Sequence, residues 1–315
     1  MPSLAEIRGV NTPVVTPHSS GCRPDLGALE QLVDFVVAGG VRGICIGGTS
    51  GEFIHYSLEE RKEMVAAAVR RTRAPVIAGI SHSTLDGALE LAGAAAESGA
   101  RALLLMPPYF FRYAQEEIRE FFLRFADRAP QSLPILLYNI PAFTNEISAD
   151  TTRELLSSGR FAGIKDSSGS FDAFIRLKAL RARYPFTLLV GDDKIFAEAR
   201  AQGADGVVSG VAGVIPELLV GIDRAIVAGA GSQAQGLDRR LREFIAWLER
   251  FPVPSGIKLA LGERGLPVGP ESVPFSPARR RLADQFKAWF REWLPAVLQE
   301  AAEETVERQR QRGAR

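Results

Sequence analysis

The chain alternates eight short apolar runs with longer stretches of helical character. The runs are rich in Val, Ile and Leu, and nearly all of them end in Gly, Pro, Ser or Asp. They span residues 9–17, 41–48, 74–81, 101–108, 134–141, 161–168, 186–193 and 204–212. Runs of this kind are typical of strands that are buried on both faces of a parallel sheet. Eight β/α units in strict alternation therefore predict an α/β protein built as a (β/α)8 TIM barrel.

Two of the intervening stretches carry helix-boundary signals. Residues 57–71 open with Ser57 and have Glu60 three positions on, which is a capping box. The stretch 83–100 has Gly99 next to its last position, and glycine commonly ends helices. A doubly wound sheet is the alternative architecture, but it more usually has a Gly-rich phosphate-binding turn after its first strand. The "TPHSSG" that follows the first run is not such a turn.

The pattern changes after the eighth run. Residues 214–305 are helical in character, with breaks at 251–256 and 267–277, and this is more helix than a barrel needs. We therefore divide the chain into barrel strands and helices, residues 1–213, and a second part, residues 214–315. The second part contains the last barrel helix, a C-terminal helical extension and a charged tail. The tail, "EETVERQRQRGAR", is expected to fray.

Bulk properties exclude several classes of partner. The 315 residues include 38 basic and 37 acidic side chains, a balance that gives no electrostatic footprint for nucleic acid or an anionic membrane. No apolar run is long enough to span a bilayer, and the N-terminal residues lack the pattern of a secretory signal. Cys22 and Cys45 form no C-x-x-C pair, and Cys45 lies in an apolar run. We expect a reduced, cytoplasmic protein without a resident cofactor.

A lysine occupies the last buried position of the sixth run, "FAGIKDSSGS". The chain has only six lysines among its 38 basic residues, so lysine is not its usual surface cation. Because burying an unpaired ammonium is costly, Lys165 is either paired, for example with Asp166, or held neutral. A neutral amine attacks a carbonyl carbon to form a Schiff base, and the iminium then draws electrons from the adjacent carbon–carbon bond. Lys165 is therefore a candidate nucleophile.

Two further runs end in polar residues that could assist this amine. Because side chains alternate along a strand, Tyr138 and Lys165 are expected at similar heights on neighbouring strands, with Gly163 leaving space in the barrel. Tyr138 could carry the protons that imine chemistry needs, although core tyrosines bonded to backbone are common. Thr49 and Ser50 lie between glycines after the second run. They could bind a carboxylate together with backbone N–H groups, or form an ordinary turn.

In combination, these motifs resemble the dihydrodipicolinate synthase / N-acetylneuraminate lyase superfamily of pyruvate-dependent class I aldolases. The motifs are "GTSGE" (48–52), "PPYF" (107–110), "YNIP" (138–141), "GIKDSSG" (163–169) and "GDD" (191–193). The resemblance extends over roughly residues 7–295. It implies a (β/α)8 barrel with C-terminal helices, usually assembled as a homotetramer that is a dimer of dimers. It also implies a small-molecule substrate, either pyruvate and an aldehyde or a 2-keto acid.

The resemblance assigns roles residue by residue. Lys165 matches the Schiff-base lysine, and Tyr138 matches the tyrosine that transfers protons. Thr49 and Ser50 match the pair that binds the pyruvate carboxylate and joins the proton relay. Tyr109 matches the tyrosine that a neighbouring subunit contributes to the relay.

The remaining substrate-binding candidates bear on specificity. The pocket is expected to include Gly48, Val208 and the carbonyl of Gly191. In dihydrodipicolinate synthases an arginine after "YN-x-P" holds the carboxylate of the second substrate, but Phe143 stands there and cannot make that bidentate contact. This departure, together with Phe53 in "GTSGEF", favours cleavage of a 2-keto-3-deoxy sugar acid. The alternative is a dihydrodipicolinate synthase that condenses pyruvate with aspartate semialdehyde.

Three other interpretations stay open. His18, His55 and His82 fall in the first three loops, where they could hold zinc in a metal-dependent aldolase, although we expect no metal. Otherwise they are loop histidines, with His82 a candidate substrate contact. The chain could also be a sugar-acid-binding barrel without turnover, although binding alone does not require an amine nucleophile. The aromatic segment 107–113, "PPYFFRY", is interpreted as a subunit interface.

Overall fold

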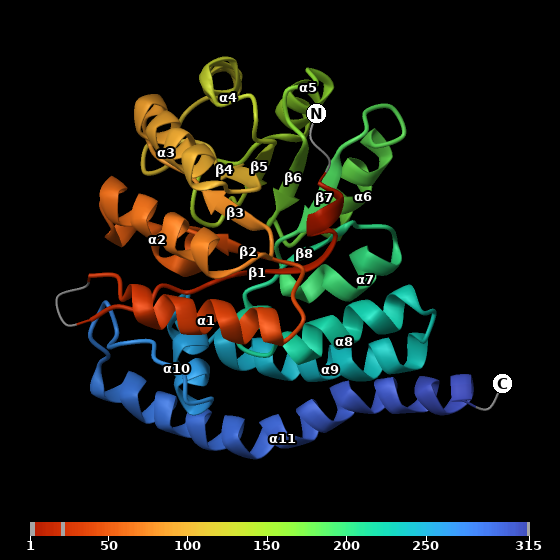
Figure 1. Cartoon of the computed structure of the whole chain (residues 1–315). Coiled ribbons are helices and arrows are strands. Elements are labelled where there is room, and N and C mark those ends of the chain that lie inside the picture. Colours follow the sequence, from red (N-terminus) through yellow and green to blue (C-terminus); the bar gives the residue numbers. More distant parts are fainter. Residues whose placement is uncertain (1–3, 20–22, 314–315) are drawn as a thin grey trace.

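All eight predicted runs form strands of one closed parallel barrel in the computed structural model, which describes residues 4–19 and 23–313 (Figure 1). The strands are β1 (Gly9–Pro13), β2 (Gly43–Ile46), β3 (Val76–Gly79), β4 (Ala102–Leu105), β5 (Ile135–Asn139), β6 (Gly163–Asp166), β7 (Thr187–Val190) and β8 (Gly206–Val208). They pair in sequence order, and β8 closes on β1. The TIM-barrel prediction is confirmed, and the doubly wound alternative is wrong.

Helices cover the outside of the barrel (Figure 1). They are α1 (Leu26–Ala38), α2 (Leu58–Arg71), α3 (Leu85–Ser98), α4 (Gln115–Arg128), α5 (Ala149–Ser157), α6 (Phe171–Leu180), α7 (Phe196–Ala201) and α8 (Pro216–Val227). The capping box of α2 forms as predicted, because the Ser57 side chain accepts from the Glu60 amide and the Glu60 carboxylate accepts from the Ser57 amide. Gly99 ends α3 with a φ of 86°, the left-handed conformation that favours glycine.

The apolar core has two layers. The larger lies between the barrel and the helices and contains the outward side chains of the strands, such as Leu137 and Ile164. The smaller fills the barrel interior and includes the fully buried Cys45, which is a free thiol, as predicted for a core residue. Leu4 and Ile7, which precede β1, belong to this inner layer, so they close the end of the barrel at which the strands begin.

A helical extension follows the barrel and consists of α9 (Gly231–Leu248), α10 (Ser255–Glu263) and α11 (Pro277–Gly313). Figure 1 shows α11 as a long curved helix that lies along α8, α9 and α10. Aromatic rings join α9 to α11: Phe244 stacks on Trp289 and Trp293 at interplanar angles of 17° and 13°. Both predicted breaks in this region are present, and a third, at 228–230, follows from the left-handed Gly229.

Helix α11 continues to Gly313, so it includes most of the charged tail, whose last two residues lie outside the described part of the chain; the expectation that the tail frays stays a prediction. Within the part of the chain that the structure describes, no helix has the length and apolar character needed to cross a membrane.

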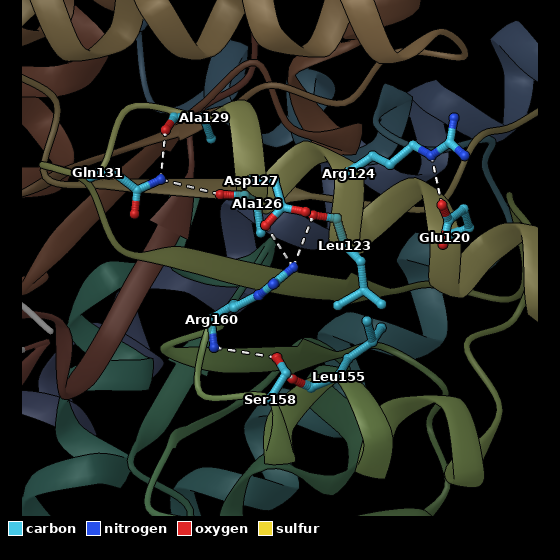
Figure 2. Close-up of polar contacts among 10 residues, drawn as sticks. All are labelled: Glu120, Leu123, Arg124, Ala126, Asp127, Ala129, Gln131, Leu155, Ser158 and Arg160. Atoms are coloured by element: carbon cyan, nitrogen blue, oxygen red, sulfur yellow. Dashed lines mark hydrogen bonds and ion pairs between the residues drawn. The ribbon is translucent and has the colours of Figure 1, made fainter.

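The loop that leads into β6 is fixed to α4 by polar contacts on the outside of the barrel (Figure 2). Arg160 pairs with Asp127 at 2.7 Å, and the same nitrogen donates to the Leu123 carbonyl at 3.5 Å. Its own amide donates to Ser158 Oγ at 3.3 Å. The ion pair is solvent-exposed and adds little stability, but together these contacts define the path by which the chain enters the strand that carries Lys165.

Candidate active site

Tyr138 and Lys165 are direct register partners on the neighbouring strands β5 and β6. Both side chains are buried, and Lys165 Nζ lies 4.0 Å from the centroid of the Tyr138 ring. Leu136 shares the inner layer with Tyr138, whereas Leu137 packs outward, so the predicted alternation of side chains is correct. The amine and the phenol therefore lie together at the ends of their strands, where TIM barrels hold their reactive groups.

Asp166 does not neutralise Lys165. Its carboxylate accepts from Asn139 Nδ2 at 2.7 Å and from Ser168 Oγ at 2.6 Å. Successive side chains point to opposite faces of a strand, so Asp166 lies on the other face of β6 from Lys165. Among the described residues Lys165 takes part in no ion pair. The hypothesis of a lysine paired with Asp166 is therefore wrong, and a buried amine without a bonded counter-charge remains.

Gly191 sets the space around this amine, whereas Gly163 does not. A Cβ on Gly191 would lie 2.7 Å from Lys165 Cε and 1.9 Å from Ser167 Oγ, so only glycine fits beside the lysine. Gly163 does not leave space in the barrel as predicted. A Cβ there would lie 2.3 Å from the Thr187 carbonyl oxygen, because the backbone of β7 already occupies that position.

Thr49 is brought to Tyr138 by a short turn after β2. The Thr49 and Tyr138 hydroxyls lie 3.2 Å apart, within hydrogen-bonding distance. The turn is a 3-10 helix, η2 (Thr49–Gly51), which is tied to the loop after β1 by the bond from Thr16 Oγ1 to the Gly51 carbonyl at 2.7 Å. Ser50 lies on the same turn. A continuous polar path thus runs from Thr49 through Tyr138 to the neighbourhood of Lys165.

The other predicted substrate-binding residues lie close to this path. Gly48 precedes the turn, and a Cβ on it would lie 3.4 Å from Cys45 Sγ. Val208 ends β8 and belongs to the inner layer that contains Tyr138. Both positions therefore lie at the end of the barrel that holds the lysine.

Asp193 is a second acidic group near the lysine that the sequence did not single out. Its Oδ2 accepts from the Val211 amide at 3.3 Å, and its Oδ1 is buried without a hydrogen-bond partner among the described residues. Burial raises the pKa of this carboxyl to about 6, while a hydrogen bond from Ser209 and the charge of Lys165 oppose the shift. The signal for this residue was present in the "GDD" motif that follows β7.

Arg61 on α2 was also missed. It is buried, donates from Nη2 to the Gly79 carbonyl at 3.0 Å, and lies 4.8 Å from the centroid of the Phe53 ring. No carboxylate in the described part of the chain pairs with it. Burial lowers its pKa to about 10. Nothing in its helical sequence context distinguishes it from the many surface arginines, so the sequence alone could not have found it.

A cavity of about 290 Å³ opens beside Thr49 and also has Tyr109 and Phe143 in its wall. Its described lining is mostly apolar and contains no lysine or arginine. The Phe143 side chain is 57% exposed, so it lies at the rim of the cavity and not in its depth. Three of the predicted site residues therefore share one cavity.

Tyr109 contacts its own chain. Its ring packs edge-on against Phe53 with centroids 5.5 Å apart, and its hydroxyl is hydrogen-bonded to Ser83. Burial raises its pKa. The next residue, Phe110, projects much farther: its side chain is 88% exposed, and its φ is 80°. The role of Tyr109 in a neighbouring subunit stays a prediction.

Each of the three histidines has a polar protein group within 3.6 Å of a ring nitrogen. His18 Nε2 lies 3.1 Å from Ser272 Oγ, and His82 Nδ1 lies 2.9 Å from Thr84 Oγ1. His55 Nδ1 is 3.6 Å from a Glu52 carboxylate oxygen. Across residues 4–19 and 23–313, no three His, Cys, Asp or Glu side chains are grouped so as to hold a metal ion.

Sequence comparison agrees with this geometry. The model of the dihydrodipicolinate synthetase family matches residues 6–292. The chain belongs to this family. It is therefore a lyase of the pyruvate-dependent class I aldolase type, as predicted.

Individual relatives differ in the activity that their names give. The chain is 33% identical to the 4-hydroxy-tetrahydrodipicolinate synthase of Methanothrix thermoacetophila, over 91% of this chain and 96% of that protein. It is 31% identical to the N-acetylneuraminate lyase of Rhizobium meliloti, over 93% of this chain and 96% of that protein. Among solved structures, a prophage protein of the family from E. coli K12, in complex with pyruvate, superimposes with a TM-score of 0.85 at 26% identity, over 92% of this chain and 99% of that one.

Proposed function

We propose that the chain cleaves a 2-keto-3-deoxy sugar acid to pyruvate and a neutral hydroxyaldehyde through an imine on Lys165. The observation that carries the chemistry is the buried Lys165 amine, which has no bonded carboxylate among the described residues and lies 4.0 Å from the Tyr138 ring centroid. An amine that is not held as an ammonium by a carboxylate is free to act as a nucleophile.

Each step then has a group in reach. The Lys165 amine adds to the C2 keto carbon, and Tyr138 gives its proton to the departing hydroxyl group, so that water leaves and an iminium and a phenolate form. Tyr138 takes the proton from the C4 hydroxyl as the C3–C4 bond breaks, and the electrons of that bond pass to the iminium nitrogen, which gives an enamine and the aldehyde. Protonation at C3 and hydrolysis release pyruvate and the free amine. The hydrogen bond between Tyr138 and Thr49 supports the proton transfers, since it links the phenol to a second hydroxyl.

The turn that carries Thr49 and Ser50 is the proposed site for the C1 carboxylate. It combines two hydroxyl side chains with the amides of a tight turn, the groups from which anion-binding concavities are built. Gly48, Val208 and the Gly191 carbonyl complete the proposed pocket around C1 to C3.

In this proposal, Phe143 determines which type of substrate is accepted. A carboxylate brought against its exposed ring would lose hydration without gaining a partner, so a substrate with a charged distal group is disfavoured. Neutral hydroxyl groups suffer a much smaller penalty. This supports a sugar-acid substrate over aspartate semialdehyde.

The alternative is a 4-hydroxy-tetrahydrodipicolinate synthase, and it is favoured by the 33% identity to a relative of that name. That reaction would need another cation for the second carboxylate. Arg61 is a candidate, because it has no acidic partner in the described part of the chain and lies beside Phe53 and Tyr109 of the cavity wall. Side-by-side kcat/KM values for the two substrate types decide between the reactions. Efficient condensation of pyruvate with aspartate semialdehyde, about 10⁴ M⁻¹s⁻¹ or more, would overturn the sugar-acid proposal.

The imine itself is tested by mass spectrometry. Incubation with pyruvate followed by borohydride should add one reduced pyruvyl group to the peptide that contains Lys165. The other five lysines serve as internal controls and should stay unmodified. A Lys165→Ala protein that keeps the parent rate would show that the lysine is not the nucleophile.

We further propose a cytoplasmic homotetramer, a dimer of dimers. Phe110 and Phe111 are 88% and 63% exposed, which suits burial against a second subunit better than contact with water. Light scattering should give four subunits per particle, and a monomer would exclude the proposal. If Tyr109 of the partner subunit completes the relay, mixed tetramers of Tyr109→Phe and Lys165→Ala chains should regain activity.

A further inference from the structure

The C-terminal extension reaches the active-site turn through one buried ion pair. Lys258 on α10 pairs through Nζ with Glu52 Oε2, and both residues are less than a tenth exposed. The second carboxylate oxygen of Glu52 accepts from Ser272 Oγ at 2.9 Å. Both oxygens of Glu52 are thus bound by residues more than two hundred positions away in the sequence.

Glu52 is also part of the turn that carries Thr49. Its amide donates to the Thr49 carbonyl at 3.0 Å and closes η2, and its carbonyl accepts from the His55 amide at 2.9 Å. Its φ of 53° and ψ of 35° are left-handed, a conformation that residues with a Cβ adopt rarely and at a cost. The side-chain bonds from Glu52 to Lys258 and Ser272 are contacts outside the turn that can hold a glutamate in this conformation.

Space exists on both sides of the Glu52 side chain. Glu52 lines the cavity of about 290 Å³ that also has Thr49 in its wall. It also lines a separate cavity of about 250 Å³, whose wall includes Lys258, Ser272 and Lys287. When Lys258 is removed, the Glu52 carboxylate can therefore move into either of the two cavities. One of them is the cavity beside Thr49, where a second negative charge would repel a substrate carboxylate.

We propose that Lys258 is a positioning residue of the active site: through Glu52 it fixes the turn that presents Thr49 and Ser50 to the substrate carboxylate. This inference rests on the proposed function, because it assumes that the turn binds that carboxylate. Buried ion pairs add little net stability compared with apolar residues, but they can select one conformation. Lys258 thus serves substrate binding at a distance and touches no reacting atom.

The test measures how borohydride trapping of pyruvate on Lys165 depends on pyruvate concentration. Lys258→Met should raise the half-saturating pyruvate concentration about tenfold or more, since small misplacements of binding groups have effects of this order. Trapping at saturating pyruvate should reach the parent level, because Lys165 and Tyr138 are untouched. Lys287→Met is the matched control: it removes a cation from the same cavity wall, is not an ion-pair partner of Glu52, and should leave half-saturation unchanged.

A double variant keeps the test decisive if Lys258→Met folds poorly. Glu52→Gln with Lys258→Met contains no unpaired buried charge. The double variant should therefore show no higher half-saturating pyruvate concentration than Glu52→Gln alone. A large further rise in the double variant would overturn the proposal, as would a Lys258→Met protein with a lower melting temperature and unchanged half-saturation. Absence of trapping in the parent protein would instead refute the imine on Lys165, so the two failures are distinguishable.

Discussion

The Lys165 side-chain nitrogen lies over the face of the Tyr138 ring, 4.0 Å from its centroid, while the Tyr138 hydroxyl is 3.2 Å from that of Thr49. The lysine therefore does not occupy the hydrogen-bonding position of the phenol. The amine and the phenol are held next to each other by strand register, and the phenol hydroxyl has a separate hydrogen-bonding partner in Thr49. This division of contacts underlies the first prediction.

Tyr138→Phe keeps the ring beside Lys165 and removes only the hydroxyl. We expect kcat to fall roughly 10²–10⁴-fold, the usual contribution of a positioned general acid–base group. Borohydride trapping of pyruvate at long incubation times should still modify Lys165. Tyr184→Phe, at a half-buried tyrosine on the outer layer, is the control and should retain the parent rate. A Tyr138→Phe protein with the parent kcat would rule out a proton-transfer role.

Gly191→Ala tests the space beside the lysine. The new methyl group would lie 2.7 Å from Lys165 Cε and 1.9 Å from Ser167 Oγ, so the amine must move. We expect imine formation, measured by trapping, to slow about a hundredfold, because misplaced reacting groups lose rate on this scale. Gly93→Ala places a methyl group where no atom lies within 4 Å and should leave trapping unaffected. Equal trapping rates for Gly191→Ala and Gly93→Ala would show that Lys165 can shift to accommodate the new methyl group without losing reactivity.

Asp193 predicts a pH dependence of stability. Burial raises the pKa of its carboxyl from 3.8 to about 6, so between these values the folded chain binds a proton that the unfolded chain does not. This group therefore destabilises the folded state progressively as pH rises through about 6. Asp193→Asn is neutral at every pH, so its melting temperature relative to the parent should be higher at about pH 7.5 than at about pH 4.5. The same difference in melting temperature between Asp193→Asn and the parent at both pH values would contradict the raised pKa.

Phe143→Arg tests substrate choice at the rim. A guanidinium there can pair with a distal carboxylate, and we expect kcat/KM for aspartate semialdehyde to rise about tenfold, the factor that ~1.4 kcal/mol gives. Activity with neutral-tailed sugar acids should fall or stay level. Phe143→Leu separates the effect of charge from that of losing the ring. If the arginine and leucine variants respond alike to both substrates, Phe143 does not set specificity.

Local patterns were sufficient to predict the barrel. Strand composition and alternation identified all eight strands, and the same alternation placed Tyr138 beside Lys165 before any contact was known. Capping signals at Ser57 and Gly99 also formed as predicted, because such signals depend on residues only a few positions apart.

Side-chain partners were harder to predict. The alternative in which Lys165 is bonded to Asp166 is wrong because neighbours in a strand point to opposite faces, and Asn139 and Ser168 bind the aspartate instead. The contact between Glu52 and Lys258 joins segments that no local pattern connects, so it required the fold itself. Sequence reasoning thus located the candidate reacting groups but not the residues that contact them.

The exposure of Phe143 bears on how such enzymes diversify. A side chain that is 57% exposed contributes little to folding, so selection can replace it without a loss of stability that would need compensation elsewhere. Lys165 and Tyr138, locked into the barrel, have no such freedom. Given the proposed role of Phe143 in substrate choice, a change at this position can exchange one aldehyde for another independently of changes in the rest of the barrel. Relatives near 30% identity that bear different enzyme names are the expected outcome, and a few rim positions should track activity better than overall identity does.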